Sequence, residues 1–314
     1  MKAVKYILNI VIWAVVAVFV SCSREINLST EVIIVNPDKA HPVELNKGRI
    51  IELETTDSSL LYDITRIAFL KNKFFIFSRN KIVVFDKDGN YLFDLSGLGQ
   101  ALHDYAGIAS LFVKNEHIYL YDSMGKKVLC FNESGSFISS TNINPNNPYP
   151  LSDIYPLSDD RFIGKNMFRG DHVQTPVGSI LDENYHTVDV VKGKNVNSGM
   201  TVYDNFFQYQ EEILYWEVLC DTIFHISDSK IIPKYYVDFG QYAIPESERK
   251  NKDIYDLIDY TNNPENINKT AGFIRYINED ERYVKFMFIF QQKTHYTFYD
   301  KSTKIAHVYR FIDT

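Results

Sequence analysis

The sequence is poor in the features that mark several large protein classes. It has only three cysteines, and its 33 basic side chains are outnumbered by 40 acidic ones, giving a net charge of −7. Nucleic acid is therefore excluded as the expected partner, because binding a phosphate backbone requires a basic face. Alanine and leucine do not dominate, which argues against a helical bundle. No apolar run reaches the about 20 residues of a membrane-spanning helix.

Aromatic residues, in contrast, are abundant. Tyrosine and phenylalanine each occur 22 times, and aromatic residues make up 15% of the chain. Aromatic side chains pack well on a pleated sheet, so this composition favours strands over helices. The hydrophobic fraction of 45% and the charged fraction of 23% are ordinary for a globular protein and exclude extensive disorder.

The first 22 residues have the organisation of an export signal. Lys2 and Lys5 precede the apolar run Ile7–Val20, and the sequence Val20-Ser21-Cys22 follows. This junction resembles the lipobox of bacterial lipoproteins. We therefore predict a lipoprotein signal peptide over residues 1–21 and lipid attachment at Cys22. The alternatives are an ordinary signal peptide and an uncleaved anchor.

The lipobox resemblance implies that Cys22 carries several acyl chains, which hold a protein durably on a bilayer. We accordingly expect a protein of the bacterial cell envelope that is anchored in a membrane by its N-terminal lipid. Ser23 is compatible with sorting to the outer membrane, as the lipoprotein family implies. Residues 22–46 are predicted as a tether, with a short strand over residues 31–35.

A strand–turn–strand unit recurs along the chain. Residues 81–91 and 127–137 align at an offset of 46 residues, and weaker copies lie at 180–188, 222–228 and 296–303. In the first two copies an Asp or Asn opens the turn and a Gly closes it, which is typical of a β-hairpin. Strand-rich repeats of this length predict an all-β protein, a β-propeller over residues 47–314. A β-sandwich would not predict the self-similarity.

The last repeat is separated from the previous one by 73 residues, which indicates an insertion at about residues 241–280. Pro245 and the acidic residues after it suit the first turn of a helix. Apolar residues follow at helical spacing, so we predict one short helix over residues 246–260 and a loop over residues 262–266. We expect the insertion to project from the ring as a partner surface.

The order of several short motifs resembles a family of bacterial lipoproteins that form six-bladed β-propellers and are similar to NHL-repeat propellers. The resemblance covers most of residues 45–314 and implies no established activity. Besides Cys22, the matching segments are 48–53, 59–64, 85–89, 221–224 and 236–240. In that family the first of these segments closes the ring by joining the last blade.

Two features depart from the family pattern. The glycine-rich loop that follows the first repeat in the family is reduced here to Gly97–Tyr105, which keeps only its outer elements. In addition, the sequence contains five repeats and stops soon after the fifth. The ring therefore has five blades, or stays open, or belongs to a chain that is shorter than the family.

The sequence contains no local motif for catalysis or for binding a metal or cofactor. Gly97-Leu98-Gly99 lacks the third glycine of a dinucleotide-binding loop, since position 102 is leucine. The eight histidines are scattered and form no zinc motif. We therefore predict no catalytic, cofactor-binding or metal-binding residue. Cys130 and Cys220 are predicted to be unpaired, because they fall in non-adjacent blades.

Two functions remain open. The preferred hypothesis is a non-enzymatic binding or scaffold protein with a protein or glycan partner. The alternative is an envelope hydrolase or lyase that acts on glycan or peptide at the propeller axis. A cluster of charged or metal-ligating side chains at the axis would favour the enzyme, and an apolar or uncharged lining would favour the binding protein.

Overall fold

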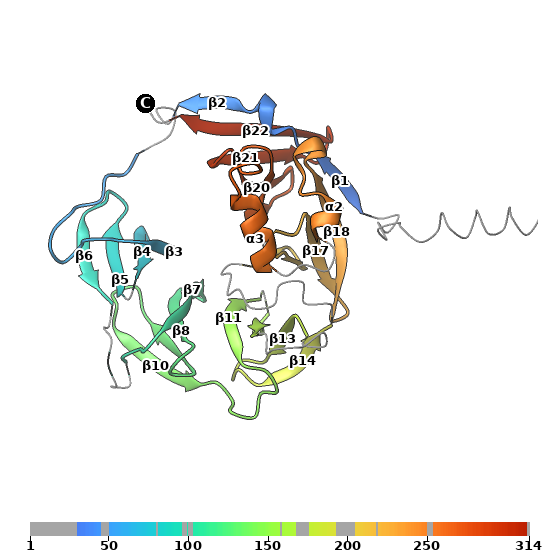
Figure 1. Cartoon of the computed structure of the whole chain (residues 1–314). Coiled ribbons are helices and arrows are strands. Elements are labelled where there is room, and N and C mark those ends of the chain that lie inside the picture. Colours follow the sequence, from blue (N-terminus) through green and yellow to red (C-terminus); the bar gives the residue numbers. More distant parts are fainter. Residues whose placement is uncertain are drawn as a thin grey trace, which may run out of the picture.

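In the computed structural model, five sheets stand around a common axis as the blades of a β-propeller (Figure 1). The structure describes residues 30–44, 50–79, 81–95, 99, 103–157, 159–167, 176–192, 205–217, 219–249 and 254–312. The predicted signal peptide and Cys22 lie outside these residues. No helix in the described part of the chain is long and apolar enough to cross a membrane.

Each blade is an antiparallel meander of four consecutive strands. Blade 1 contains β3 (Ile64–Leu70), β4 (Lys73–Ser78), β5 (Lys81–Asp86) and β6 (Tyr91–Asp94). Blade 2 contains β7 (Ile108–Lys114), β8 (His117–Asp122), β9 (Lys127–Phe131) and β10 (Phe137–Asn142). Blade 3 contains β11 (Leu151–Pro156), β12 (Phe162–Asn166), β13 (Gly178–Leu181) and β14 (Thr187–Val191).

Blade 4 contains β15 (Phe206–Tyr209), β16 (Glu212–Tyr215), β17 (Thr222–Ser227) and β18 (Lys230–Asp238). Blade 5 contains β19 (Ala271–Glu279), β20 (Tyr283–Phe290), β21 (Lys293–Asp300) and β22 (Ile305–Ile312). The five repeats in the sequence correspond to the hairpins between the third and fourth strands of the five blades. The predicted propeller is therefore confirmed, with five blades.

The hairpin turns form as their sequence predicts. The Asp86 carboxylate accepts hydrogen bonds from the backbone N–H groups of Asp88 and Asn90, at 2.8 and 2.9 Å. In the equivalent turn of blade 2, the Asn132 side chain accepts from the N–H groups of Ser134 and Ser136. The closing glycine, Gly89 in the first turn, has a φ of 94°, which a residue with a side chain rarely adopts.

The N-terminal segment adds a strand to each of two blades. β1 (Glu31–Ile34) pairs in parallel with β18 at the outer edge of blade 4, and β2 (His41–Glu44) pairs in parallel with β22 in blade 5. A short 3₁₀ helix, η1 (Pro37–Lys39), lies between them. The strand expected at 31–35 is present, but residues 30–44 belong to the ring and are not part of a free tether.

The strand that joins the last blade is β2, and not residues 48–53 as the family resemblance implied. Residues 50–53 form no strand and instead cover the outer face of blade 1. There, Leu53 and Leu61 pack against the buried side chains Ile76, Val83 and Phe85.

Apolar cores fill four of the five blade interfaces. Separate buried clusters join blade 1 to blade 2, blade 2 to blade 3, blade 3 to blade 4, and blade 4 to blade 5. Within the described residues, no such cluster joins blade 5 to blade 1, and Figure 1 shows these two blades set apart. The ring is therefore not closed by packing of one sheet on another at this interface.

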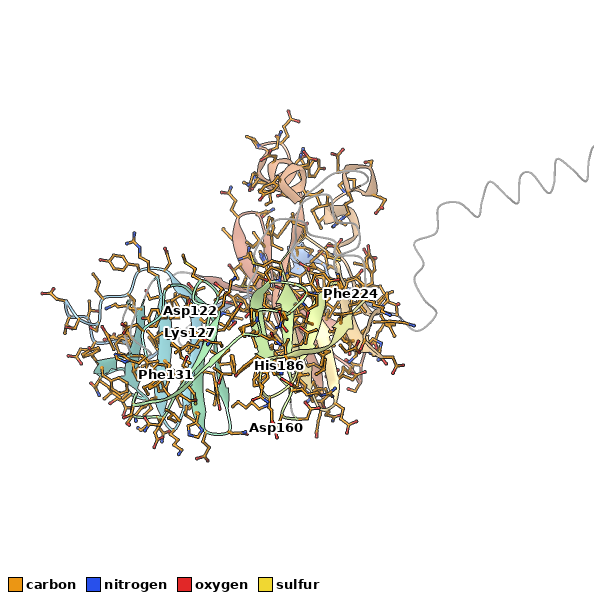
Figure 2. The ribbon with its side chains drawn as sticks, turned by 90° about the horizontal axis from the view of Figure 1, so that it is seen from below. Asp122, Lys127, Phe131, Asp160, His186 and Phe224 are labelled. Carbon is orange, nitrogen blue, oxygen red and sulfur yellow. The ribbon has the colours of Figure 1, made fainter. Side chains whose placement is uncertain are left out.

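The insertion lies between β18 and β19, and Figure 2 shows that its helices project from one face of the ring. It contains η3 (Gly240–Tyr242), α2 (Glu246–Arg249) and α3 (Ile254–Asn262). The sequence predicts a single helix over residues 246–260, whereas the described residues form two helices, α2 and α3. The predicted insertion also extended too far, because residues 271–279 form the innermost strand of blade 5.

The two remaining cysteines are free, as predicted. Cys130 lies on β9 in blade 2, and Cys220 precedes β17 in blade 4. The two thiols therefore lie in blades 2 and 4, which are the non-adjacent blades expected from the sequence repeats.

A pair of substitutions in blade 5 tests whether the ring is open. Phe288 is fully buried against blade 4, whereas Phe298 lies on the opposite face of the same blade and is 36% exposed. Phe288→Ala should lower the free energy of unfolding by about 3–5 kcal/mol. Phe298→Ala should cost at most about half as much, because no blade formed by the described residues covers Phe298. Denaturant unfolding measures both values, and equal losses would show that a further sheet packs on blade 5.

Candidate functional site

The innermost strand of blade 5, β19, departs from regular strand geometry. Its pairing with β20 shifts twice, once between Gly272 and Arg275 and again between Arg275 and Asn278. Phe273 and Tyr276 have φ values of 57° and 51°. The other described non-glycine residues with positive φ lie in turns or loops between strands. β19 therefore contains two β-bulges, each with an aromatic residue in the left-handed region.

The bulges change the side-chain period of β19. Ala271, Ile274 and Ile277 all lie in the core shared with blade 4, at a spacing of three residues. A regular strand would present every second residue to that core. Each bulge thus adds one residue, and Phe273 and Tyr276 are turned away from the core. Positive φ is unfavourable for bulky side chains, and such strain tends to collect at functional sites.

Tyr276 reaches a cavity at the propeller axis. This axis cavity has a volume of about 420 Å³ and is lined by Tyr276, by Leu111 of β7 and by residues 64–67 of β3. Ile64, Ile67 and Tyr276 are each at least half exposed. The cavity therefore lies where β19 comes near blade 1, and most of its lining is apolar.

The charged residue in the axis cavity, Arg66, takes part in a network that joins three blades. Its guanidinium pairs with the Asp153 carboxylate of β11 at 2.6 Å. The Ser110 hydroxyl of β7 donates to the same carboxylate and accepts a hydrogen bond from the backbone N–H of Ile154. All three side chains are buried. The charge of Arg66 is thus balanced within the ring.

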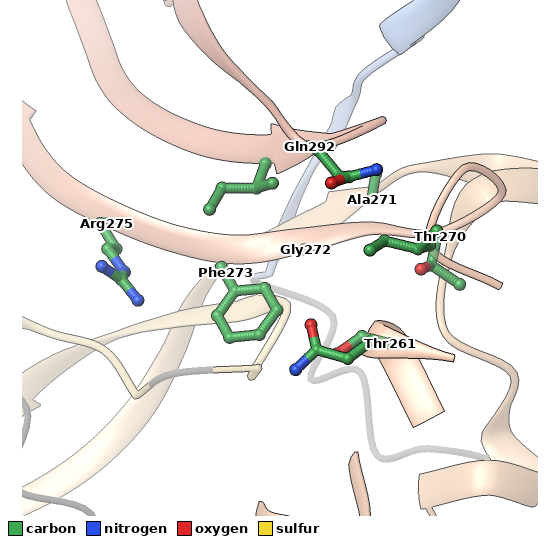
Figure 3. Close-up of a pocket in the computed structure, with 10 residues that line it drawn as sticks. Thr261, Thr270, Ala271, Gly272, Phe273, Arg275 and Gln292 are labelled. Carbon is green, nitrogen blue, oxygen red and sulfur yellow. The ribbon is translucent and has the colours of Figure 1, made fainter. Parts of the chain in front are cut away.

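The other bulge faces a second cavity, shown in Figure 3. This insertion cavity, of about 160 Å³, lies between β19, the end of α3 and the turn between β20 and β21. Phe273 and Arg275 project from the same side of β19, toward the segment that contains Thr261 (Figure 3). Phe273 also packs against the small core of the insertion, which includes Leu257. The insertion and blade 5 therefore build this cavity together.

An ion pair holds the insertion to blade 4. The Arg249 guanidinium of α2 contacts the Asp221 carboxylate at 2.6 Å and donates to the backbone carbonyl of Leu219. Leu219 packs against Ile244 and Leu257 in the core of the insertion. The position of α3 over β19 is therefore set by blades 4 and 5 together.

The described part of the chain contains neither a metal-ligand cluster nor an activated thiol. None of their His, Cys, Asp and Glu side chains form a group of three or more that could hold a metal ion. Burial raises the pKa of the Cys220 thiol to about 11 and also raises the pKa of Cys130. Both thiols are therefore protonated at neutral pH and are poor nucleophiles. The predicted lipid-attachment residue, Cys22, lies outside the described part of the chain.

Phe273, Arg275 and Tyr276 were not identified from the sequence. The signal that could have revealed them is the three-residue spacing of Ala271 and Ile274 with Ile277, which fits neither a regular strand nor a helix.

The fold is a β-propeller of five blades, and the innermost strand of its last blade carries two bulges that border two cavities. The chain belongs to the family described as a domain of unknown function, DUF4934, whose profile matches residues 44–313. No match was found among curated proteins.

Two solved structures are similar to this chain. One is a Bacteroides fragilis protein inferred to be exported, with 20% identity and a TM-score of 0.69 over 89% of this chain and 80% of that chain. The other is a DUF4221 family member from Bacteroides vulgatus, with 11% identity and a TM-score of 0.52 over 84% of this chain and 88% of that chain. At these identities the similarity concerns the fold alone.

We expect that the Tyr276 side chain does not contribute to the free energy of unfolding. Glycine adopts positive φ freely, so Tyr276→Gly should leave the free energy of unfolding unchanged or raise it. Tyr276→Ala removes the same ring but keeps the backbone strain, and should be about 1 kcal/mol less stable than the glycine variant. Thermal and denaturant unfolding compare the two variants. A large loss for Tyr276→Gly would show that the exposed ring stabilises the fold.

Proposed function

We propose that this protein is a non-enzymatic binding or scaffold propeller, anchored by acyl chains at Cys22 in a bacterial envelope membrane, with a protein or glycan partner. The observation that supports binding most directly is β19, which turns Phe273 and Tyr276 into two cavities at a cost in backbone strain. The export signal in the sequence supports the envelope location, and Ser23 supports sorting to the outer membrane.

The partner surface in this proposal is the face from which the insertion projects (Figure 2). The end of α3 lines the insertion cavity, and the α3 residue Tyr255 is 56% exposed. Exposed aromatic side chains supply much of the contact area at protein interfaces and also stack against sugars. The insertion is therefore suited to contact a macromolecule.

The alternative enzyme function finds less support at the axis. The axis cavity has an apolar lining except for Thr65 and Arg66, and Arg66 is paired with Asp153. An apolar lining was the feature expected of a binding protein.

Lipid anchoring is tested by replacing the predicted attachment residue. Cys22→Ser should abolish incorporation of an alkyne-labelled fatty acid and release the protein from the membrane fraction. The reason is that, in this proposal, all acyl chains are attached to Cys22. Cys130→Ser is the matched control and should behave like the wild type, since that thiol is buried. Unchanged labelling of the Cys22→Ser variant would contradict the proposed anchor.

The partner surface is tested by removing the insertion. Deletion of residues 246–267, bridged by a short glycine–serine linker, should leave the ring folded, because none of the four cores between blades contains a residue of this segment. Capture of a cross-linked partner from membranes, quantified by mass spectrometry, should fall at least tenfold.

The point variant Tyr255→Ser should weaken the same capture without any change of fold. The control is Met124→Ser, which replaces a 74% exposed residue in the turn between β8 and β9 of blade 2. Undiminished capture by the deletion variant would refute the assignment of this surface.

A further inference from the structure

Arg275, in the insertion cavity, differs in its charge partners from three other arginines of the protein. Arg66, Arg249 and Arg282 each pair with an aspartate. Arg275 has no ion pair within the described residues, and its Nε is shielded from solvent without a hydrogen-bond partner there. Its guanidinium lies 5.8 Å from the centre of the Phe273 ring. A shielded donor without a partner is costly, which points to a ligand that supplies the acceptor.

The remaining polar groups of the cavity complement this donor. The Thr261 hydroxyl donates to the carbonyl of Ile258 at 3.0 Å, and the Thr270 hydroxyl donates to the carbonyl of Asn266 at 3.1 Å. Both hydroxyl oxygens therefore remain able to accept hydrogen bonds.

The side-chain amides of Asn262 and Gln292 line the cavity as well, and both residues are exposed. No acidic residue is among the residues that line it. The cavity thus combines one cation, neutral polar groups and an apolar wall that includes Phe273.

We propose that the insertion cavity binds a small carboxylate-bearing ligand. The carboxylate pairs with the Arg275 guanidinium, whose planar donors match its two oxygens. Neutral polar groups of the ligand contact the threonine hydroxyls and the side-chain amides, and its apolar part lies against Phe273. The volume of about 160 Å³ suits one sugar ring or the end of a peptide, and is below that of most drug-sized sites. This inference rests on the proposed function, because it assigns a ligand class to the same binding strand.

The test is calorimetric titration of the full chain in detergent with D-glucuronate, N-acetylglycine and glucose at equal ionic strength. Glucuronate represents an acidic sugar, N-acetylglycine represents a peptide carboxylate, and glucose lacks the carboxylate. At least one carboxylate should bind at least tenfold more tightly than glucose. The carboxylate that binds identifies the source of the ligand.

Three variants show whether Arg275 is responsible. Arg275→Gln should weaken carboxylate binding at least tenfold, and Arg275→Lys should give an intermediate loss because it keeps the charge without the planar donors. The control is Arg79→Gln, which removes an arginine that also lies over an aromatic ring, that of Tyr62 at 5.3 Å, but outside the cavity. It should bind as the wild type does, and thermal unfolding confirms that each variant is folded.

The inference is overturned if neither carboxylate binds, if glucose binds equally well, or if Arg275→Gln binds as tightly as the wild type. These outcomes are separable from failure of the proposed function. Loss of partner capture on deleting the insertion, together with no carboxylate binding, would reject the ligand class alone. Carboxylate binding with undiminished partner capture would reject the partner surface alone.

Discussion

Each sheet of a propeller has two large faces, and both must be shielded from water. Blades 2, 3 and 4 meet this requirement through neighbours on both sides, whereas blades 1 and 5 have one packed neighbour each within the described residues. The chain covers β4 and β5 of blade 1 with Leu53 and Leu61, on the face that no other blade covers within the described residues. On blade 5, Phe298 makes edge-to-face contacts with Tyr283 and Tyr309, with ring centres 6.2 and 5.6 Å apart. Within the described residues, the faces of blades 1 and 5 that have no packed neighbour are therefore the sheet faces that remain partly accessible to solvent.

Polar contacts near the axis and at the blade interfaces fix how the blades are oriented. The fully buried pair Lys165–Glu217, at 3.1 Å, joins blade 3 to blade 4. Between blades 4 and 5, the Glu279 carboxylate contacts Lys234 at 2.9 Å. Such buried pairs contribute little net stability, but removing one partner is costly, so they disfavour displaced arrangements of the blades. A firmly oriented framework of this kind can hold β19 in its unfavourable backbone conformation.

The parts of the fold that depend on local sequence were predictable, and those that depend on distant contacts were not. The turns after Asp86 and Asn132 form from hydrogen bonds within five residues, so their sequence was sufficient. The pairing of residues 31–34 with β18 joins segments about 200 residues apart, and sequence patterns do not specify such a register.

The same reasoning explains why the candidate site was missed. The bulges of β19 depend on the packing of Ala271, Ile274 and Ile277 against blade 4, which is a property of the assembled ring. The sequence indicated the insertion and its helical character, because Leu257 and Ile258 follow a helical period. It could not indicate that Phe273 and Arg275 would face the insertion across a cavity.

Under the proposed acylation of Cys22, the incorporation of β1 into blade 4 also limits how far the ring can travel from a bilayer. With Cys22 as the acylated residue, only eight peptide units separate the lipid from Thr30, where the described structure begins. A chain extends at most about 3.5 Å per residue, so the edge of blade 4 remains within about 28 Å of the anchor point, close to the thickness of one hydrocarbon core. A propeller anchored in the proposed way would sample only a thin layer of the envelope next to its own membrane, and molecules beyond that layer would be out of its reach.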